Sequence, residues 1–135
     1  MDDVGVVEGT DGEDATWPAE ARHLASIRAH TRHRLAGLGL DDDDVDDAVM
    51  AVNEAASNAV EHAYAGPGDG TVSMSVRAGP DEVRIDVADH GSWRTPPADN
   101  GNRGHGMPLM RGLVDTFSIL HGPGGTLVSL GLARR

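Results

Sequence analysis

The feature that most constrains the fold is a long apolar stripe in the middle of the chain. Its members recur at the i, i+3, i+4, i+7 spacing that places side chains on one face of an α-helix. They are Val45, Ala48, Val49, Val52, Ala56, Ala59, Val60 and Ala63. Aspartates at 41–44 can cap the free N–H groups at the start of such a helix, and the Gly- and Pro-rich cluster at 65–70 ends it. A helix with one apolar face must bury that face against a second layer.

Two alternating segments downstream can form that second layer. Apolar residues at 72, 74 and 76 fall on one face of a strand, as do those at 83, 85 and 87, with Gly79-Pro80-Asp81 between them. This pattern predicts an antiparallel hairpin. Residues 117–120 and 126–132 predict a second hairpin, joined by a Gly-rich turn.

The remaining elements are shorter. Residues 15–17 suit an edge strand, and a helix is expected from Pro18 to Leu35, because proline fits a first helical turn. Gly37 and Gly39 should end this helix. A long Gly-, Pro-, Asn- and Asp-rich loop at 89–106 precedes a short helix expected at about 108–115. Loops of this length inside a small domain usually carry function.

Together these elements predict one α+β domain at 15–135: a two-layer sandwich with a mixed, mostly antiparallel sheet and helices on one face. Residues 1–14 hold six acidic side chains and few large apolar ones, so we expect a disordered tail. The net charge of −11 argues against direct nucleic-acid binding, which favours a basic surface. The chain shows no signal peptide or membrane-spanning stretch, and it lacks cysteine. A cytoplasmic protein without membrane contact is therefore expected.

The first candidate site lies on the central helix. Glu54 and Asn58 are four positions apart, so they lie about 40° apart around the helix axis and one turn apart along it. Neither belongs to the apolar stripe. An amide oxygen can bind Mg²⁺, and a carboxylate can accept a proton from an attacking hydroxyl. By itself the pair also fits an ordinary solvated helix face.

Three further candidates follow in chain order. Asp89 and Gly91 come directly after a strand, where a carboxylate can accept a hydrogen bond from an exocyclic amine and a glycine lets a flat ring approach. Arg103, Gly104 and Gly106 precede a helix whose free N–H groups can hold phosphate oxygens. Thr126 opens the last strand after two glycines. Each of these patterns alone also fits a simple turn.

Their order and spacing resemble the GHKL (Bergerat-fold) ATP-binding superfamily, and within it the bacterial anti-sigma factor serine/threonine kinases. The segment AVNEAASNAVEHAY at 51–64 resembles the N box of that family. Asp89-x-Gly91, Gly104-x-Gly106 and Gly125-Thr126 resemble its three glycine boxes. The resemblance spans about residues 17–132.

The resemblance implies a role for each matching residue. Glu54 would be the catalytic base, and Asn58 would ligate Mg²⁺. The residues expected to contact the adenine end of ATP are Asp89, Gly91 and Thr126. Those expected to contact the phosphates are Arg103, Gly104 and Gly106. In such a kinase the substrate is a serine on an anti-anti-sigma (STAS-type) protein, the same surface sequesters a sigma factor, and the protein is a homodimer.

One departure from the family pattern concerns the second glycine box, where Met107 and Pro108 follow Gly106 in place of the usual leucine. Proline is tolerated in a first helical turn. Two other functions remain open at this point. One is the catalytic domain of a sensor histidine kinase, and the other is an ATP-binding module that switches partners without catalysis.

Overall fold

The computed structural model of the protein describes residues 14–62, 70–90, 112–122 and 125–134. In chain order the elements are β1 (Ala15–Pro18), the 3₁₀ turn η1 (Ala21–His23), α1 (Leu24–Leu35), α2 (Asp42–His62), β2 (Thr71–Ala78), β3 (Glu82–His90), β4 (Thr116–Gly122) and β5 (Gly125–Ala133). None of the helices within these ranges is long and apolar enough to cross a membrane.

The five strands form one sheet in the order β1-β2-β3-β5-β4. The two predicted hairpins, β2–β3 and β4–β5, are present, and β3 joins them by pairing with β5. All four pairings are antiparallel, so the parallel component of the expected mixed sheet is not found among the described strands. The α+β class holds.

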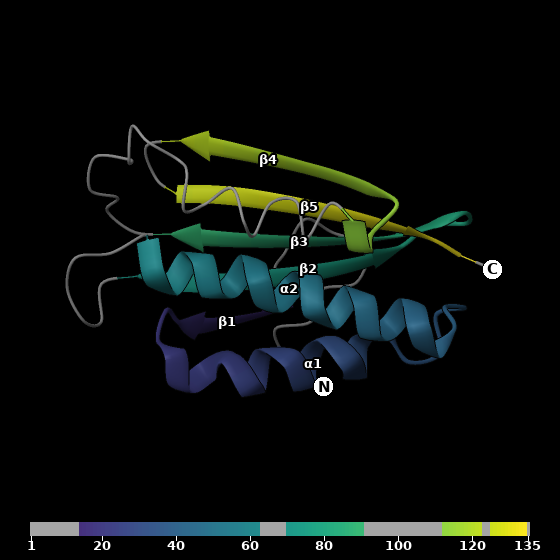
Figure 1. Cartoon of the computed structure of the whole chain (residues 1–135), viewed down its shortest axis with the longest axis horizontal. Coiled ribbons are helices and arrows are strands. Elements are labelled where there is room, and N and C mark those ends of the chain that lie inside the picture. Colours follow the sequence, from purple (N-terminus) through teal and green to yellow (C-terminus); the bar gives the residue numbers. More distant parts are fainter. Residues whose placement is uncertain (1–13, 63–69, 91–111, 123–124, 135) are drawn as a thin grey trace.

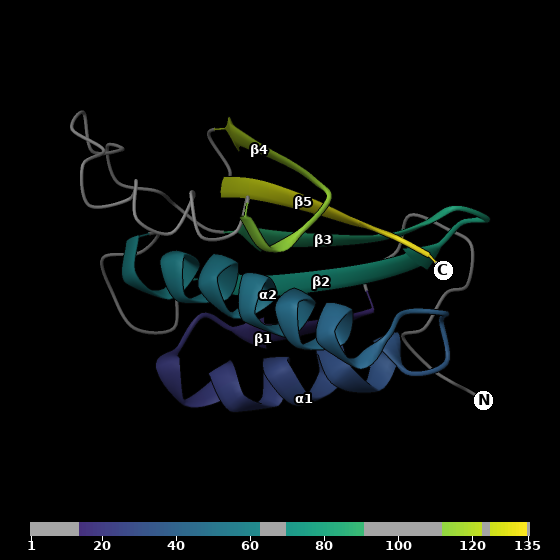
Figure 2. The same cartoon turned by 45° about the vertical axis from the view of Figure 1, so that its right-hand side comes forward.

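Helices α1 and α2 lie side by side on one face of the sheet, as Figures 1 and 2 show from two directions. The core fills the space between the layers. On β2 and β3 it takes the alternate residues that the sequence indicated, with Val72, Met74, Val83, Ile85 and Val87 buried. The predicted two-layer sandwich with helices on one face is confirmed.

Helix α2 begins as predicted, because the Asp41 carboxylate accepts a hydrogen bond from the Asp44 N–H at 3.0 Å. Its buried face is wider than the predicted stripe, since Ala51 and Ala55 are also buried. A row of small side chains lets the helix backbone approach the sheet closely. The predicted stripe, which followed helical spacing from Val45, omitted Ala51 and Ala55.

The predicted start of the first helix at Pro18 is wrong. Pro18 ends β1, where it is the partner of Thr71, and the Ala19 N–H donates to the Gly70 carbonyl at 2.9 Å. Proline is also tolerated on an edge strand, and here the sheet pairing keeps the chain extended through Glu20 (φ −133°, ψ 143°). The end of the helix is as predicted: Gly37 and Gly39 adopt φ of 81° and 85°.

The predicted helix at 108–115 also ends earlier than expected. Residues 108–111 lie outside the described part of the chain, and residues 112–113 are helical. Asp115 is already joined to the sheet, since its N–H donates to the Gly131 carbonyl at 2.9 Å. Strands β4 and β5 each extend one or two residues beyond the predicted ends.

Asp14 fastens the start of the domain. Its N–H donates to the Met74 carbonyl at 2.7 Å, and its Oδ2 accepts from Arg34 Nε at 2.7 Å and from the Val76 N–H at 3.1 Å. The carboxylate is 7% exposed. These contacts tie β2 to α1, so Asp14, which was expected in the acidic tail, is part of the described fold.

Candidate functional site

Helix α2 presents Glu54 and Asn58 on a side of its own. The core side carries Val52 and Ala55, which are buried, whereas Glu54 and Asn58 are half-buried. Neither of these two polar side chains has a hydrogen bond or ion pair with any residue in the described ranges. Their oxygens are therefore not used in holding the described fold together.

The opposite flank of α2 is committed to structure. Asn53 accepts a hydrogen bond from Arg28 of α1 at 2.9 Å, and Asp46 pairs with Arg32 of α1 at 2.8 Å. Consecutive helical residues are about 100° apart, so Asn53 points toward α1 while Glu54 points away from it. The two helices thus leave the Glu54 side open for another role.

The adenine-end candidates Asp89 and Thr126 are brought together by the sheet. They are direct partners in the β3–β5 ladder, and Asp89 Oδ1 accepts the Thr126 N–H at 3.0 Å. Both are nearly buried, at 7% and 8% exposure. The hydrogen bond fixes the orientation of the carboxylate, which a group selecting one base edge requires.

Gly125 completes this contact. Its φ is 144°, a value that L side chains rarely adopt, and an added Cβ would lie 1.9 Å from the Asp89 carbonyl oxygen. A side chain at 125 would therefore push β5 away from Asp89. Sequence reasoning placed this glycine in a glycine box, and the structure gives the steric reason for it.

The two parts of the site lie on the same face and at the same end of the domain. Alternation along the strands places Asp89 with Val87, and Thr126 with Val128, on the face that α2 covers. The C-terminal end of α2, the end of β3 and the start of β5 lie together in Figures 1 and 2. Asn58 is in the last turns of α2, so it lies toward the end of the domain at which β3 ends and β5 begins.

Sequence reasoning missed one contact near the site. Ser73 Oγ and His90 Nε2 are 3.2 Å apart on the outer face of the sheet, with Ser73 1% exposed. His90 follows Asp89, so strand alternation turns it to the opposite face. The pair joins the end of β3 to β2 behind Asp89. The sequence gives no distinct signal for it, because Ser73 is one of two serines that alternate with apolar residues along β2.

Gly91, Arg103, Gly104 and Gly106, together with Met107 and Pro108, lie outside the described residues. The assigned contacts of Gly91 with the adenine, and of Arg103, Gly104 and Gly106 with the phosphates, stay predictions. The candidate residues within the described ranges are Glu54, Asn58, Asp89 and Thr126.

The described residues hold no cluster of three or more His, Cys, Asp or Glu side chains arranged for a metal ion. A divalent cation in this site would thus need other ligands. Mg²⁺ commonly takes one or two protein oxygens and completes its shell with phosphate oxygens and water. The Asn58 amide, half-buried and unpaired within the described ranges, fits that arrangement.

Comparison with known proteins supports the nucleotide assignment. Residues 17–132 match the family described as the histidine kinase-like ATPase domain. The chain belongs to this family. The matched range includes Glu54, Asn58, Asp89 and Thr126 and all of the described elements apart from the first two residues of β1 and the last residue of β5.

Several relatives carry the name serine-protein kinase RsbW. One from Staphylococcus epidermidis is 29% identical over 126 residues, which cover 82% of this chain and 79% of the relative. One from Bacillus velezensis is 35% identical over 74 residues, which cover 55% of this chain but only 46% of the relative. This chain therefore matches about half the length of the Bacillus kinase.

Solved structures show the same fold. The structure of the RsbU and RsbW domains of Rv1364c from Mycobacterium tuberculosis aligns with a TM-score of 0.67 and 30% identity, covering 90% of this chain and 32% of that one. The catalytic domain of histidine kinase ThkA aligns with a TM-score of 0.54 and 11% identity, covering 89% of this chain and 96% of that one. At that identity the second alignment shows the fold alone.

Proposed function

We propose that this chain is an ATP-dependent protein serine kinase that transfers the γ-phosphate of ATP to a serine of an antagonist protein. The observation that carries the proposal is an oriented, nearly buried carboxylate on β3 together with two polar side chains on α2 that no described residue binds. Asp89 is oriented by the Thr126 N–H, and Glu54 and Asn58 make no hydrogen bond with the described residues. Relatives named serine-protein kinase favour serine as the acceptor.

At the adenine end, Asp89 accepts a hydrogen bond from the N6 amine of the base. Because a carboxylate accepts hydrogen bonds, this nearly buried group favours a base edge that donates. Gly125 keeps β5 close enough for the Thr126 N–H to hold that carboxylate. Gly91 leaves room for the ring, as its position in the sequence predicts.

At the reacting end, Glu54 accepts the proton of the serine hydroxyl as its oxygen bonds to the γ-phosphorus. The bond from that phosphorus to the bridging oxygen breaks, and ADP leaves. Asn58 offers its amide oxygen as a ligand to Mg²⁺, which would neutralise phosphate charge when bound. Because phosphoryl transfer depends on positioning and electrostatics, the rigid attachment of both side chains to one helix supports this role.

The partners are part of the proposal. We expect an anti-anti-sigma (STAS-type) protein as the phosphate acceptor and a sigma factor as a second partner of the same surface. We also expect a homodimer, which sedimentation analysis of the purified protein would test. The alternatives are a histidine-kinase catalytic domain and a non-catalytic partner-switching module.

Isothermal titration with a non-hydrolysable ATP analogue tests the proposed site. The wild-type protein should bind the analogue in the presence of Mg²⁺, and Asn58→Ala should lose the Mg²⁺-dependent part of the affinity. Asn53→Ala is a matched control, because that amide is bonded to Arg28 on the other flank of α2. A folded wild-type protein that gives no heat at millimolar analogue would refute the nucleotide site.

A further inference from the structure

The solvent side of α2 carries an exposed apolar residue beside the proposed catalytic base. Among the described residues the exposed large hydrophobics are Met50, at 50%, and Leu120, at 65%. Met50 precedes Glu54 by four positions, which places the two about 40° apart around α2 and about 6 Å apart along its axis. An exposed apolar side chain at this place can contact whatever approaches Glu54.

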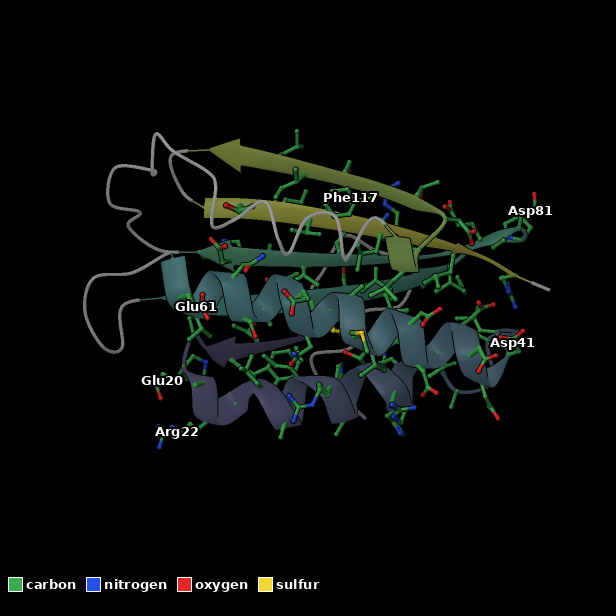
Figure 3. The ribbon with its side chains drawn as sticks, viewed as in Figure 1. Glu20, Arg22, Asp41, Glu61, Asp81 and Phe117 are labelled. Carbon is green, nitrogen blue, oxygen red and sulfur yellow. The ribbon has the colours of Figure 1, made fainter. Side chains whose placement is uncertain are left out.

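Acidic residues continue the same side of the helix. Asp47 and Asp43 precede Met50 by three and seven positions, so they share its face. Neither has an ion pair with a residue of the described ranges. We call Asp43, Asp47, Met50 and Glu54 the α2 strip. Figure 3 looks onto this helix layer, with Asp41 and Glu61 labelled at opposite ends of α2.

We propose that the α2 strip docks a basic segment of the protein substrate, with an apolar side chain of that segment against Met50. The proposal rests on the proposed kinase function, because Glu54 marks where the acceptor serine must lie. Charge complementarity selects the partner, since the strip carries three carboxylates around one methionine. The flanking Arg32 is already paired with Asp46.

The spacing along α2 sets the expected pattern of the substrate. Measured from Glu54, Met50 is about 6 Å away, and Asp47 and Asp43 are about 10 and 16 Å away at 1.5 Å per residue. An extended peptide advances about 3.3 Å per residue. The substrate should therefore carry an apolar residue about two positions from the serine and Lys or Arg about three to five positions from it.

A second copy of the chain fits the strip less well. The arginines that flank α2, Arg28 and Arg32, are engaged by Asn53 and Asp46 of their own molecule. The strip is itself acidic, so the same strip of a second copy would repel it. A separate basic partner meets neither obstacle.

Fluorescence anisotropy with two labelled peptides tests the proposal. Their sequences are Ser-Ala-Leu-Lys-Lys-Lys and the reverse order, because the geometry leaves the chain direction open, and each has a counterpart with Glu in place of Lys. A basic peptide should bind the wild-type protein in a salt-sensitive manner, and its Glu counterpart should not. Met50→Lys should weaken binding about tenfold, and Asp43→Asn/Asp47→Asn about three- to tenfold.

Matched variants serve as controls. Leu120→Lys changes the other large hydrophobic that is exposed among the described residues. Asp81→Asn/Asp86→Asn removes one charge from the β2–β3 turn and one from β3. Both should bind the peptide within about twofold of wild type, a change below the usual effect of a contact residue. Circular dichroism on every variant confirms the fold.

The outcomes separate this proposal from the kinase assignment. Titration of the ATP analogue into the same variants should give wild-type affinity, since the strip residues varied do not enter the nucleotide site. Loss of analogue binding by the wild-type protein would refute the kinase. If the wild-type protein binds the analogue, the kinase assignment stands and the peptide results decide the docking strip. The strip is refuted if both basic peptides fail to bind, if they bind as weakly as their Glu counterparts, or if Met50→Lys leaves their affinity unchanged. Self-association abolished by Met50→Lys, without peptide binding, would assign the strip to a second copy and overturn the proposal.

Discussion

Removal of the Asp14 carboxylate should destabilise the domain far more than its place next to an acidic tail indicates. The side chain is 7% exposed and accepts hydrogen bonds from Arg34 Nε and the Val76 N–H, at 2.7 and 3.1 Å. Breaking a fully buried ion pair by removing one partner costs about 3–5 kcal/mol. Arg34 is 29% exposed, so water can recover part of that loss. A buried N–H left without an acceptor costs about 1–3 kcal/mol.

We therefore expect Asp14→Ala to lose about 2–3 kcal/mol of unfolding free energy, between these two limits. For a domain of this size the melting temperature should fall by about 8–12 °C. Urea unfolding followed by circular dichroism measures the change. Glu20→Ala is the control, because its pair with Arg22 is more exposed and should contribute at most about 1 kcal/mol.

Truncation gives an independent check of the same reasoning. A chain that starts at Asp14 should keep the stability of the full chain, whereas one that starts at Ala15 should lose as much as Asp14→Ala. Ordinary surface substitutions change the unfolding free energy by less than about 0.5 kcal/mol. A change of this size for Asp14→Ala would show that the contacts of its carboxylate do not stabilise the domain.

Three further changes give distinct results. Gly125→Ala should cost about 1–3 kcal/mol of stability from backbone strain alone and should weaken binding of the ATP analogue. Gly122→Ala should fold normally, because its added Cβ would be 4.0 Å from the nearest atom. Calorimetry measures the stability of each variant, and titration measures its analogue affinity. Asp89→Asn should reduce selectivity for ATP over GTP in competition binding, and unchanged selectivity would remove Asp89 from base recognition. Burial lowers the pKa of His30, with Arg34 and His33 adding to the decrease and Asp14 opposing it. The stability that the neutral ring contributes is present above pH 6.5 and is lost as pH falls toward the lower folded-state pKa. The unfolding free energy of the wild type, measured with urea at each pH, should therefore fall more steeply with acid than that of His30→Phe. Parallel curves for the two proteins would contradict this.

Most of the sheet and the central helix could be predicted because their signals are local. The alternation at 72–76 and 83–87 requires only that one strand face be apolar, and the stripe on α2 requires only helical spacing. The start of α1 could not be predicted in this way. Pro18 is compatible with both a helix start and an edge strand, and the choice is made by pairing with Thr71, which is distant in the sequence.

The candidate site shows the same division. Glu54 and Asn58 are a local pattern on one helix, and their shared side follows from spacing alone. The contact of Asp89 with the Thr126 N–H depends on the β3–β5 pairing, which brings together segments separated by a long loop. The roles of Asp14 and Ser73 were not evident for the same reason, because their partners lie on other strands and helices.

Single-turnover phosphotransfer by Glu54→Gln tests the central claim most directly. The variant keeps the size of the side chain and one acceptor oxygen but cannot act as a base at neutral pH. With a purified antagonist protein as acceptor, it should bind the ATP analogue within a few-fold of wild type, while transfer to serine falls roughly 10²- to 10⁴-fold. Transfer at the full wild-type rate would remove Glu54 from the mechanism. Tight analogue binding by the wild-type protein without transfer to any partner would contradict the kinase and favour a partner-switching module.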